Sequence, residues 1–194
     1  MMSWDEWIFR AINRIAGQGG ILDWVMVEAS RTDDFFIPLL LAVGYWCWTN
    51  WREARIGLPT LGLLFGGGDF LGAQLKWVMK RPRPCQVLSH IHELTGCGGT
   101  FSLPSNHALN SATIAAFLHM VYPRTGWVAW PLVACIGISR VYVGAHYVTD
   151  VLWGWGLGGV LGAGGGWLLL RSRLMGRQAA VDPVTLRDGP SYPD

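Results

Sequence analysis

The 194-residue sequence is short of charged side chains. Only 14% of its residues are Asp, Glu, Lys or Arg, whereas a typical soluble domain carries about 25%. The 15 basic and 13 acidic residues nearly balance, so the dense positive charge of a nucleic-acid-binding protein is missing. Four cysteines without a CxxC pair exclude a disulfide-rich scaffold and a common zinc-site pattern. A chain that is 51% hydrophobic is not disordered either.

Long apolar segments take the place of the missing charge. The chain has 12 Trp and 26 Gly; transmembrane helices favour glycine, and the membrane interface favours tryptophan. A soluble helical protein would need polar faces toward water, which these segments lack. The sequence therefore predicts an all-α polytopic membrane protein, a bundle of about five to six transmembrane helices. Five predicted spans can be delimited: 35–51, 55–76, 103–122, 126–142 and 148–170.

The two ends of the chain differ from the middle, which gives three predicted regions. Residues 1–34 form an N-terminal amphipathic segment, residues 35–171 the transmembrane domain, and residues 172–194 a disordered cytoplasmic tail. The first region is predicted to contain a helix that lies in the membrane interface, because its apolar residues fall on one stripe. The stripe consists of Trp4, Trp7, Ile8, Ala11, Ile12 and Ile15.

Counting spans predicts that three connections share one side of the membrane. They are the loop after the second span, the segment before the third, and the loop between the fourth and fifth. Scattered cations on that side could bind lipid headgroups, but headgroup binding does not account for two histidines and a His-x3-Asp spacing. The charged and histidine residues on this side include Lys76, Lys80, Arg81, Arg83, His107, Arg140, His146 and Asp150.

Three short motifs on this side carry a family resemblance. Residues 76–84 have the form K-x6-R-P, residues 104–107 the form P-S-x-H, and residues 139–150 the form S-R-x5-H-x3-D. In this order they resemble the type 2 phosphatidic acid phosphatase superfamily, membrane lipid phosphatases related to vanadium haloperoxidases. Asn106 departs from the family pattern, which usually has glycine there.

The residue types of the motifs suit phosphoryl transfer, in which charge spreads over the phosphate oxygens. Arginine can grip these oxygens bidentately, lysine supplies a point charge, and Pro104 is expected in the first turn of a helix whose N-terminus favours phosphate. The predicted phosphate-binding residues are Lys76, Arg83, Ser105, Asn106 and Arg140, with Asn106 acting through its backbone N–H.

The resemblance also implies a mechanism without metal or cofactor. His146 would be the nucleophile that becomes phosphohistidine, and Asp150, four residues later, would orient its imidazole. His107 would protonate the leaving oxygen and then activate water. His90 and His92 with Glu93 are an alternative metal-binding group, whereas His119, at the far end of the third span, is expected to be structural.

The short chain is most similar to the bacterial undecaprenyl pyrophosphate phosphatases of this superfamily. Undecaprenyl pyrophosphate is therefore the favoured substrate, with phosphatidylglycerophosphate, phosphatidate and lipid A 1-phosphate as alternatives. A non-catalytic phospholipid-binding or transport protein is the alternative of another class. The expected partners are the bilayer and its lipid phosphate, without nucleic acid or an obligate protein partner. The expected location is the bacterial cytoplasmic membrane, with the active site on the extracytoplasmic side.

Three further features carry predictions of their own. Asp69 is predicted to lie on the same helical face as Lys76. It is expected to pair with that lysine, to line a lipid cavity or to form a hydrogen bond between helices. Cys85 and Cys97 could form a disulfide in an oxidising compartment, worth about 3 kcal/mol by chain entropy. A small-residue face for helix packing is predicted in the last span. It consists of Gly154, Gly158, Gly162 and Gly166.

Overall fold

A computed structural model describes residues 3–31 and 36–181, and the regular structure of these residues is helical throughout. This confirms the predicted all-α class. The elements in chain order are α1 (Trp4–Asn13), α2 (Ile21–Ser30), α3 (Phe36–Thr49), α4 (Trp51–Met79), α5 (Pro84–Val87), α6 (Asn106–Val121), η2 (Pro123–Thr125), α7 (Gly126–Tyr142) and α8 (Val148–Val181).

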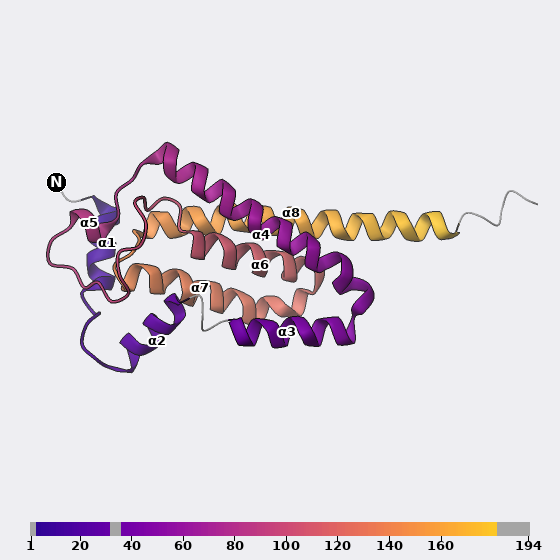
Figure 1. Cartoon of the computed structure of the whole chain (residues 1–194), viewed down its shortest axis with the longest axis horizontal. Helices are drawn as coiled ribbons and strands as arrows, with labels where there is room; N and C mark the ends of the chain where they lie inside the picture. The colour runs from indigo at the N-terminus through magenta and orange to yellow at the C-terminus, as the bar shows by residue number, and fades with distance from the viewer. Residues whose placement is uncertain (1–2, 32–35, 182–194) are drawn as a thin grey trace, which may run out of the picture.

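The five predicted spans correspond to α3, α4, α6, α7 and α8, which lie side by side in a bundle (Figure 1). Among the described helices, α4 alone is long and apolar enough to pass a test for a membrane-crossing helix by length and composition. Three of the others are shorter, with 14 residues in α3, 16 in α6 and 17 in α7. The number of spans therefore stays a prediction.

Two predicted boundaries are wrong. Helix α6 begins at Asn106, so Pro104 lies before the helix and not in its first turn. Helix α8 continues to Val181, into the tail that was expected to be disordered from residue 172. Residues 172–180 are rich in Arg, Leu, Met, Gln and Ala, which are strong helix formers. The remainder of that tail, like residue 35 at the start of the first predicted span, lies outside the described residues.

Helices α6 and α8 form the centre of the bundle, and glycines of α8 let them approach closely. A methyl group added to Gly158 would come within 2.1 Å of the Leu109 carbonyl oxygen, and one added to Gly162 within 2.2 Å of the Thr113 carbonyl oxygen. These contacts confirm that the glycine stripe is a packing face, because no larger residue fits against the backbone of α6.

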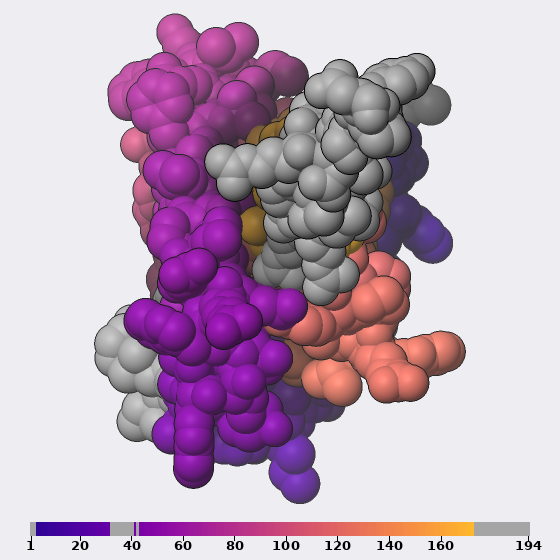
Figure 2. Space-filling view, turned by 90° about the vertical axis from the view of Figure 1, so that its right-hand side faces the viewer, coloured from indigo at the N-terminus to yellow at the C-terminus, as the bar shows by residue number. Residues whose placement is uncertain are grey.

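The distribution of side chains is the reverse of that in a soluble protein. Large apolar residues face outward along the bundle, among them Trp48 on α3, Leu63 on α4 and Trp127 on α7. Figure 2 looks along the bundle at the end where α3 ends and α4 begins, with the start of α7 projecting beside them. Charged and polar groups such as Arg140, His146 and Asp150 are buried instead. An outer surface of this kind suits lipid, and buried ionisable groups within it mark a functional site.

The N-terminal helix α1 packs against the end of the bundle where α7 ends and α8 begins (Figure 1). The buried residues of α1 are Asp5, Phe9 and Asn13, and the Phe9 ring lies 5.6 Å from the ring of Tyr147. Trp4 and Trp7 of the predicted apolar stripe are exposed, whereas Ile12 of the same stripe packs against the core around Phe9. The location of this helix in the membrane interface stays a prediction.

Candidate active site

The three motifs meet at one end of the bundle, as the loop count predicted. The first covers the last turn of α4 and the residues after it, the second covers the residues before α6 and its first two residues, and the third spans the connection from α7 to α8 (Figure 1). The N–H of Ser105 donates to the Asp150 carbonyl oxygen at 3.0 Å, which joins the second motif to the third. The N-terminus of α6 and the first turn of α8 are thereby fixed beside each other.

The turn after α7 places His146 inside the protein. Helix α7 ends at Tyr142, and Gly144 takes a positive φ of 87°, which is typical of a helix C-terminus. A methyl group on Gly144 would lie 2.6 Å from the His92 carbonyl oxygen, so glycine is required there for a second reason. The N–H of His146 then donates to the Arg140 carbonyl oxygen at 3.1 Å, leaving a side chain that is 2% exposed.

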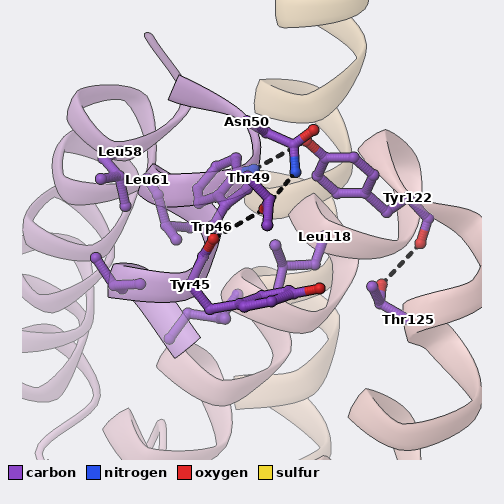
Figure 3. Close-up of a pocket in the computed structure, with 11 residues that line it drawn as sticks. Tyr45, Trp46, Thr49, Asn50, Leu58, Leu61, Leu118, Tyr122 and Thr125 are labelled. Carbon is purple, nitrogen blue, oxygen red and sulfur yellow. Dashed lines mark hydrogen bonds between the residues drawn. The ribbon is translucent and has the colours of Figure 1, made fainter. Parts of the chain in front are cut away.

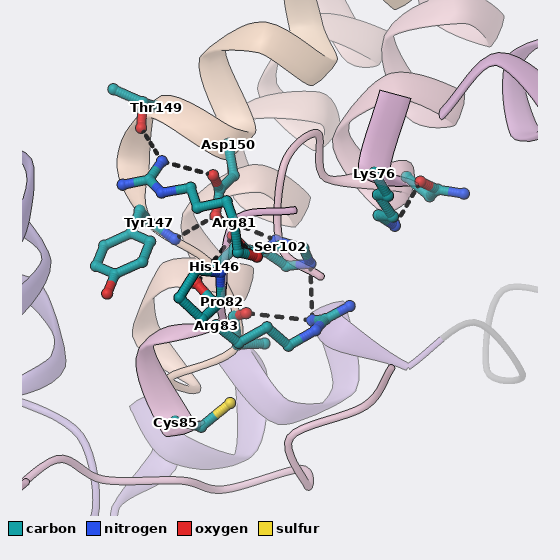
Figure 4. A network of polar contacts seen from close by, with 12 residues as sticks. Lys76, Arg81, Pro82, Arg83, Cys85, Ser102, His146, Tyr147, Thr149 and Asp150 are labelled. Atoms are coloured by element: carbon teal, nitrogen blue, oxygen red, sulfur yellow. Dashed lines mark hydrogen bonds and ion pairs between the residues drawn. The ribbon is translucent and has the colours of Figure 1, made fainter. Parts of the chain in front are cut away.

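Asp150 and Arg83 contact opposite nitrogens of the His146 ring (Figure 4). The Asp150 Oδ2 atom lies 3.5 Å from Nδ1, and the Arg83 Nη1 atom lies 3.1 Å from Nε2. Because a guanidinium can only donate, Nε2 must accept and carry no proton. The ring proton therefore resides on Nδ1, on the side of Asp150, and the lone pair of Nε2 is the nucleophilic one.

Burial sets the electrostatics of this pair. It lowers the pKa of His146 to about 4, although the neighbouring Asp150 carboxylate acts in the opposite direction and raises it. Burial also lowers the pKa of Arg83, again opposed by the charge of Asp150. At neutral pH the imidazole of the free protein is thus neutral, which is the form that can attack phosphorus.

This low pKa predicts a specific pH dependence of stability. The pKa of His146 is about 4 in the folded protein against 6.5 for an unperturbed imidazole, so the unfolded chain takes up the proton first as the pH falls. The contribution of His146 is complete above about pH 6.5 and is lost as the pH falls toward 4. The unfolding temperature in detergent should therefore drop by several degrees more in the wild type than in His146→Gln over this window. Parallel profiles would contradict the assignment.

Two predicted phosphate ligands have buried polar atoms without a hydrogen-bond partner. They are the Oγ atom of Ser105 and the Nε atom of Arg140. The Nη1 atom of Arg140 is already engaged, donating to the carbonyl oxygen of Ser30 at 2.9 Å and to the hydroxyl of the same residue. Unsatisfied buried groups are costly, and a bound phosphate would supply the missing acceptors.

The N-terminus of α6 lies at the site. Ser105 precedes the helix without capping it through its side chain, and a helix N-terminus favours an anion. His107 and Asn106 lie in the first turn of this helix, half-buried. The Nζ atom of Lys76 reaches the same turn and donates to Asn106 Oδ1 at 2.7 Å. All eight predicted site residues therefore lie at one end of the bundle.

Two residues that contact the site were given no role by the sequence reasoning, although it placed Arg81 on the side of the motifs. Arg81 lies between two carboxylates, with Nη1 2.7 Å from Asp150 Oδ1 and Nη2 2.6 Å from Asp5 Oδ2, and its guanidinium lies 4.0 Å over the Tyr147 ring (Figure 4). Asp5 also accepts from the N–H of Thr149 at 3.1 Å. The available signal was the spacing of Asp5, Phe9 and Asn13, which defines a second face of α1 beside the apolar stripe.

The disulfide between Cys85 and Cys97 is present, whereas Cys47 and Cys135 are free. It fixes the loop whose Gly99 carbonyl oxygen accepts from Arg83 Nε at 2.6 Å. Reduction, or a Cys85→Ser and Cys97→Ser double change, should therefore lower the unfolding temperature and also weaken the hold on Arg83. We expect a loss of kcat/KM of about threefold to tenfold, the size of one weakened charged hydrogen bond. Unchanged kinetics after verified reduction would contradict this role.

The best-formed apolar pocket lies at the other end of the bundle (Figure 3). Its volume is about 270 Å³, and Trp46 donates from Nε1 to the Tyr122 hydroxyl at 2.9 Å beside it. None of the predicted site residues lines this pocket. The site is thus defined by its polar groups and not by this pocket. Within the described ranges, no three His, Cys, Asp or Glu side chains gather as a metal site would require, His90, His92 and Glu93 included.

Comparison with known proteins identifies the family. Residues 57–173 match the family model described as the PAP2 superfamily, which is more than half of the chain. The protein belongs to the PAP2 superfamily, and the resemblance carried by the three motifs is confirmed.

Individual relatives include lipid phosphatases. The chain is 37% identical over 139 residues to phosphatidylglycerophosphatase B of Bacillus subtilis (strain 168), covering 64% of this chain and 63% of that protein, which is less than two thirds of its length. It is 29% identical over 148 residues to the undecaprenyl-diphosphatase BcrC of the same strain, covering 75% and 74%.

A solved structure shares the fold. The crystal structure of a transmembrane PAP2 type phosphatidylglycerolphosphate phosphatase from Bacillus subtilis matches with a TM-score of 0.63 and 28% identity, covering 93% of this chain and 87% of that one. Together with the apolar outer surface, this similarity supports a location in a membrane.

Proposed function

We propose that the protein hydrolyses a membrane lipid phosphate or pyrophosphate through a phosphohistidine at His146. The observation that carries the proposal is the position of this buried imidazole, with Nε2 3.1 Å from Arg83 Nη1 and Nδ1 3.5 Å from Asp150 Oδ2. A protein that only bound phospholipid would need cations but no oriented, neutral imidazole. The buried unpaired atoms of Ser105 and Arg140 are the further ligands that a phosphoryl group requires.

The proposed reaction has two steps. Phosphate oxygens bind Arg83, Arg140 and Lys76, and the Arg83 Nη1 atom moves from His146 Nε2 to an oxygen, since phosphorus must take its place. Nε2 forms a bond to phosphorus as the bond to the leaving oxygen breaks, and His107 gives that oxygen a proton. Neutral His107 then takes a proton from water, the water oxygen bonds to phosphorus, and Nε2 leaves. Asp150 stabilises the charge on the imidazole ring throughout.

For the substrate we infer undecaprenyl pyrophosphate, with phosphatidylglycerophosphate as the second candidate. Similarity to BcrC covers the larger share of the chain, whereas similarity to phosphatidylglycerophosphatase B has the higher identity. Phosphate release by purified protein in detergent should be measured with undecaprenyl pyrophosphate, phosphatidylglycerophosphate, phosphatidate and lipid A 1-phosphate. EDTA should leave the activity unchanged. Loss of activity with EDTA and rescue by a divalent metal would refute the metal-independent mechanism, and absence of release from every lipid would refute the function.

The proposed location is the bacterial cytoplasmic membrane, with His146 and its neighbours on the extracytoplasmic side. The disulfide at the site end of the bundle supports this orientation, because disulfides persist in oxidising compartments. In cells that carry Cys47→Ala and Cys135→Ala, a membrane-impermeant maleimide should label Cys85 and Cys97 only after reduction. If labelling requires permeabilised cells, the site faces the cytoplasm. If labelling occurs without reduction, the disulfide is absent in cells.

A further inference from the structure

The Asn106 side chain links two charged residues of α4. Its Nδ2 atom donates to Asp69 Oδ1 at 3.0 Å, and its Oδ1 atom accepts from Lys76 Nζ at 2.7 Å. Because an ionised carboxylate only accepts and an ammonium only donates, the amide has a single orientation that satisfies both neighbours. This is the position at which the sequence departs from the glycine usual in the P-S-x-H motif.

Helix α4 is shaped to receive this side chain. Asp69, Gly72 and Lys76 follow one another at spacings of three and four residues, which puts them on one face of the helix. A methyl group on Gly72 would lie 2.9 Å from Asn106 Oδ1, so any larger residue would push the amide out of its place. The amide of Asn110, one turn further along α6, also donates to Asp69 Oδ1, at 2.9 Å.

The amide separates the lysine from the carboxylate. Among the described residues no ion pair within 4.0 Å joins Lys76 directly to Asp69. A direct pair would put a negative charge where a substrate phosphate has to bind and would compete with it. Through Asn106 the ammonium is held by one neutral acceptor, which leaves two of its three donors for phosphate oxygens.

We propose that Asn106 is a positioning residue that, oriented by Asp69, fixes the Lys76 ammonium at the phosphate site. The inference rests on the proposed phosphatase function, in which Lys76 contacts the phosphate. It assigns a role to the Asn106 side chain, in addition to the backbone N–H expected from the motif. It also assigns a role to Asp69. This carboxylate of α4 accepts a hydrogen bond from Asn106 of α6, and through that amide it orients Lys76.

A double-mutant cycle tests whether Asn106 acts through Lys76. The readouts are kcat, KM and the inhibition constant of inorganic phosphate, a probe of the phosphate site alone. Asn106→Ala should raise KM and the inhibition constant about tenfold, the effect of one hydrogen bond to a charged group, while kcat falls by less. Lys76→Met should have a larger effect, and adding Asn106→Ala to Lys76→Met should change the inhibition constant less than twofold. Independent, multiplicative effects would overturn the proposal.

Two further variants separate positioning from helix packing. Asp69→Ala should reproduce the rise seen with Asn106→Ala, because the amide is then free to turn its N–H groups toward the lysine. Asn110→Ala removes an equivalent hydrogen bond to Asp69 without touching Lys76, and its inhibition constant should stay within twofold of the wild type. An equal rise in Asn110→Ala would overturn the proposal in favour of packing. A wild-type protein that releases no phosphate refutes the proposed function, whereas an active wild type with an unaffected Asn106→Ala refutes only this inference.

Discussion

Replacement of His146 with alanine is expected to lower phosphate release by at least about 10⁴-fold, the scale seen when a nucleophile is removed from an enzyme. The reason is the position of Nε2, which has no substitute within the site. Asp150 is a carboxylate already bound to Arg81 and to the Tyr147 N–H, so it cannot replace the imidazole. Retention of more than about 1% of the activity would exclude His146 as the nucleophile, because so small a loss would not fit.

Quenching the reaction in alkaline detergent distinguishes loss of chemistry from loss of binding. With a lipid substrate labelled in its phosphate, the quenched wild type should retain label that is stable to base and released by acid, as expected of a phosphoramidate. His146→Ala should retain none, although it still binds the lipid. The unfolding temperature in detergent verifies that the variant is folded. Label retained by His146→Ala would show that another residue is the nucleophile.

Replacement of His107 with alanine is expected to lower turnover by about 10²- to 10⁴-fold, the usual contribution of general acid and base catalysis. The loss should depend on the leaving group, because an alcohol needs a proton and a nitrophenolate does not. With p-nitrophenyl phosphate the first step should thus recover, and phosphoenzyme should accumulate since the second step still lacks its base. A uniform loss with both substrates would show that His107 serves another role.

His119 offers a matched control for both histidine variants. It lies on the same helix as His107, near the opposite end of α6, and is exposed. His119→Ala removes an imidazole of the same bundle, and its kcat should remain within about twofold of the wild type, as for surface substitutions in general. A loss comparable to that of His107→Ala would indicate a general effect of altering this helix.

Motif spacings together with the family resemblance indicated eight side chains of the candidate site, but not Arg81 or Asp5. Spacing within each motif fixes which side chains lie together, as His146 and Asp150 show at four residues apart. Counting the spans then predicted that the three motifs lie at one end of the bundle, since successive membrane spans alternate in direction. Pro104 was misplaced because its fit to a first helical turn is a local preference, which the chain path from Ser102 to Ser105 overrides.

The contacts that could not be predicted join residues far apart in the chain. Asp5 meets Arg81 across 76 positions, and Ser30 meets Arg140 across 110. Such pairs depend on how α1 and α2 pack against the bundle, which the periodicity of either helix does not specify. The tryptophans of the apolar stripe of α1 identified its outward face, so the polar face that contacts the site remained without an assigned role.

The packing of α1 and α2 bears on how this protein can be recombined with its relatives. The family match starts at residue 57, yet Asp5 and Ser30 hold two of the arginines inside that region. In a chimaera, a foreign N-terminal segment without these acceptors would leave the partly buried Arg81 and the buried Arg140 short of partners. A chimaera that is designed to exchange substrate preference between members of the superfamily should therefore take α1, α2 and the bundle from the same parent protein.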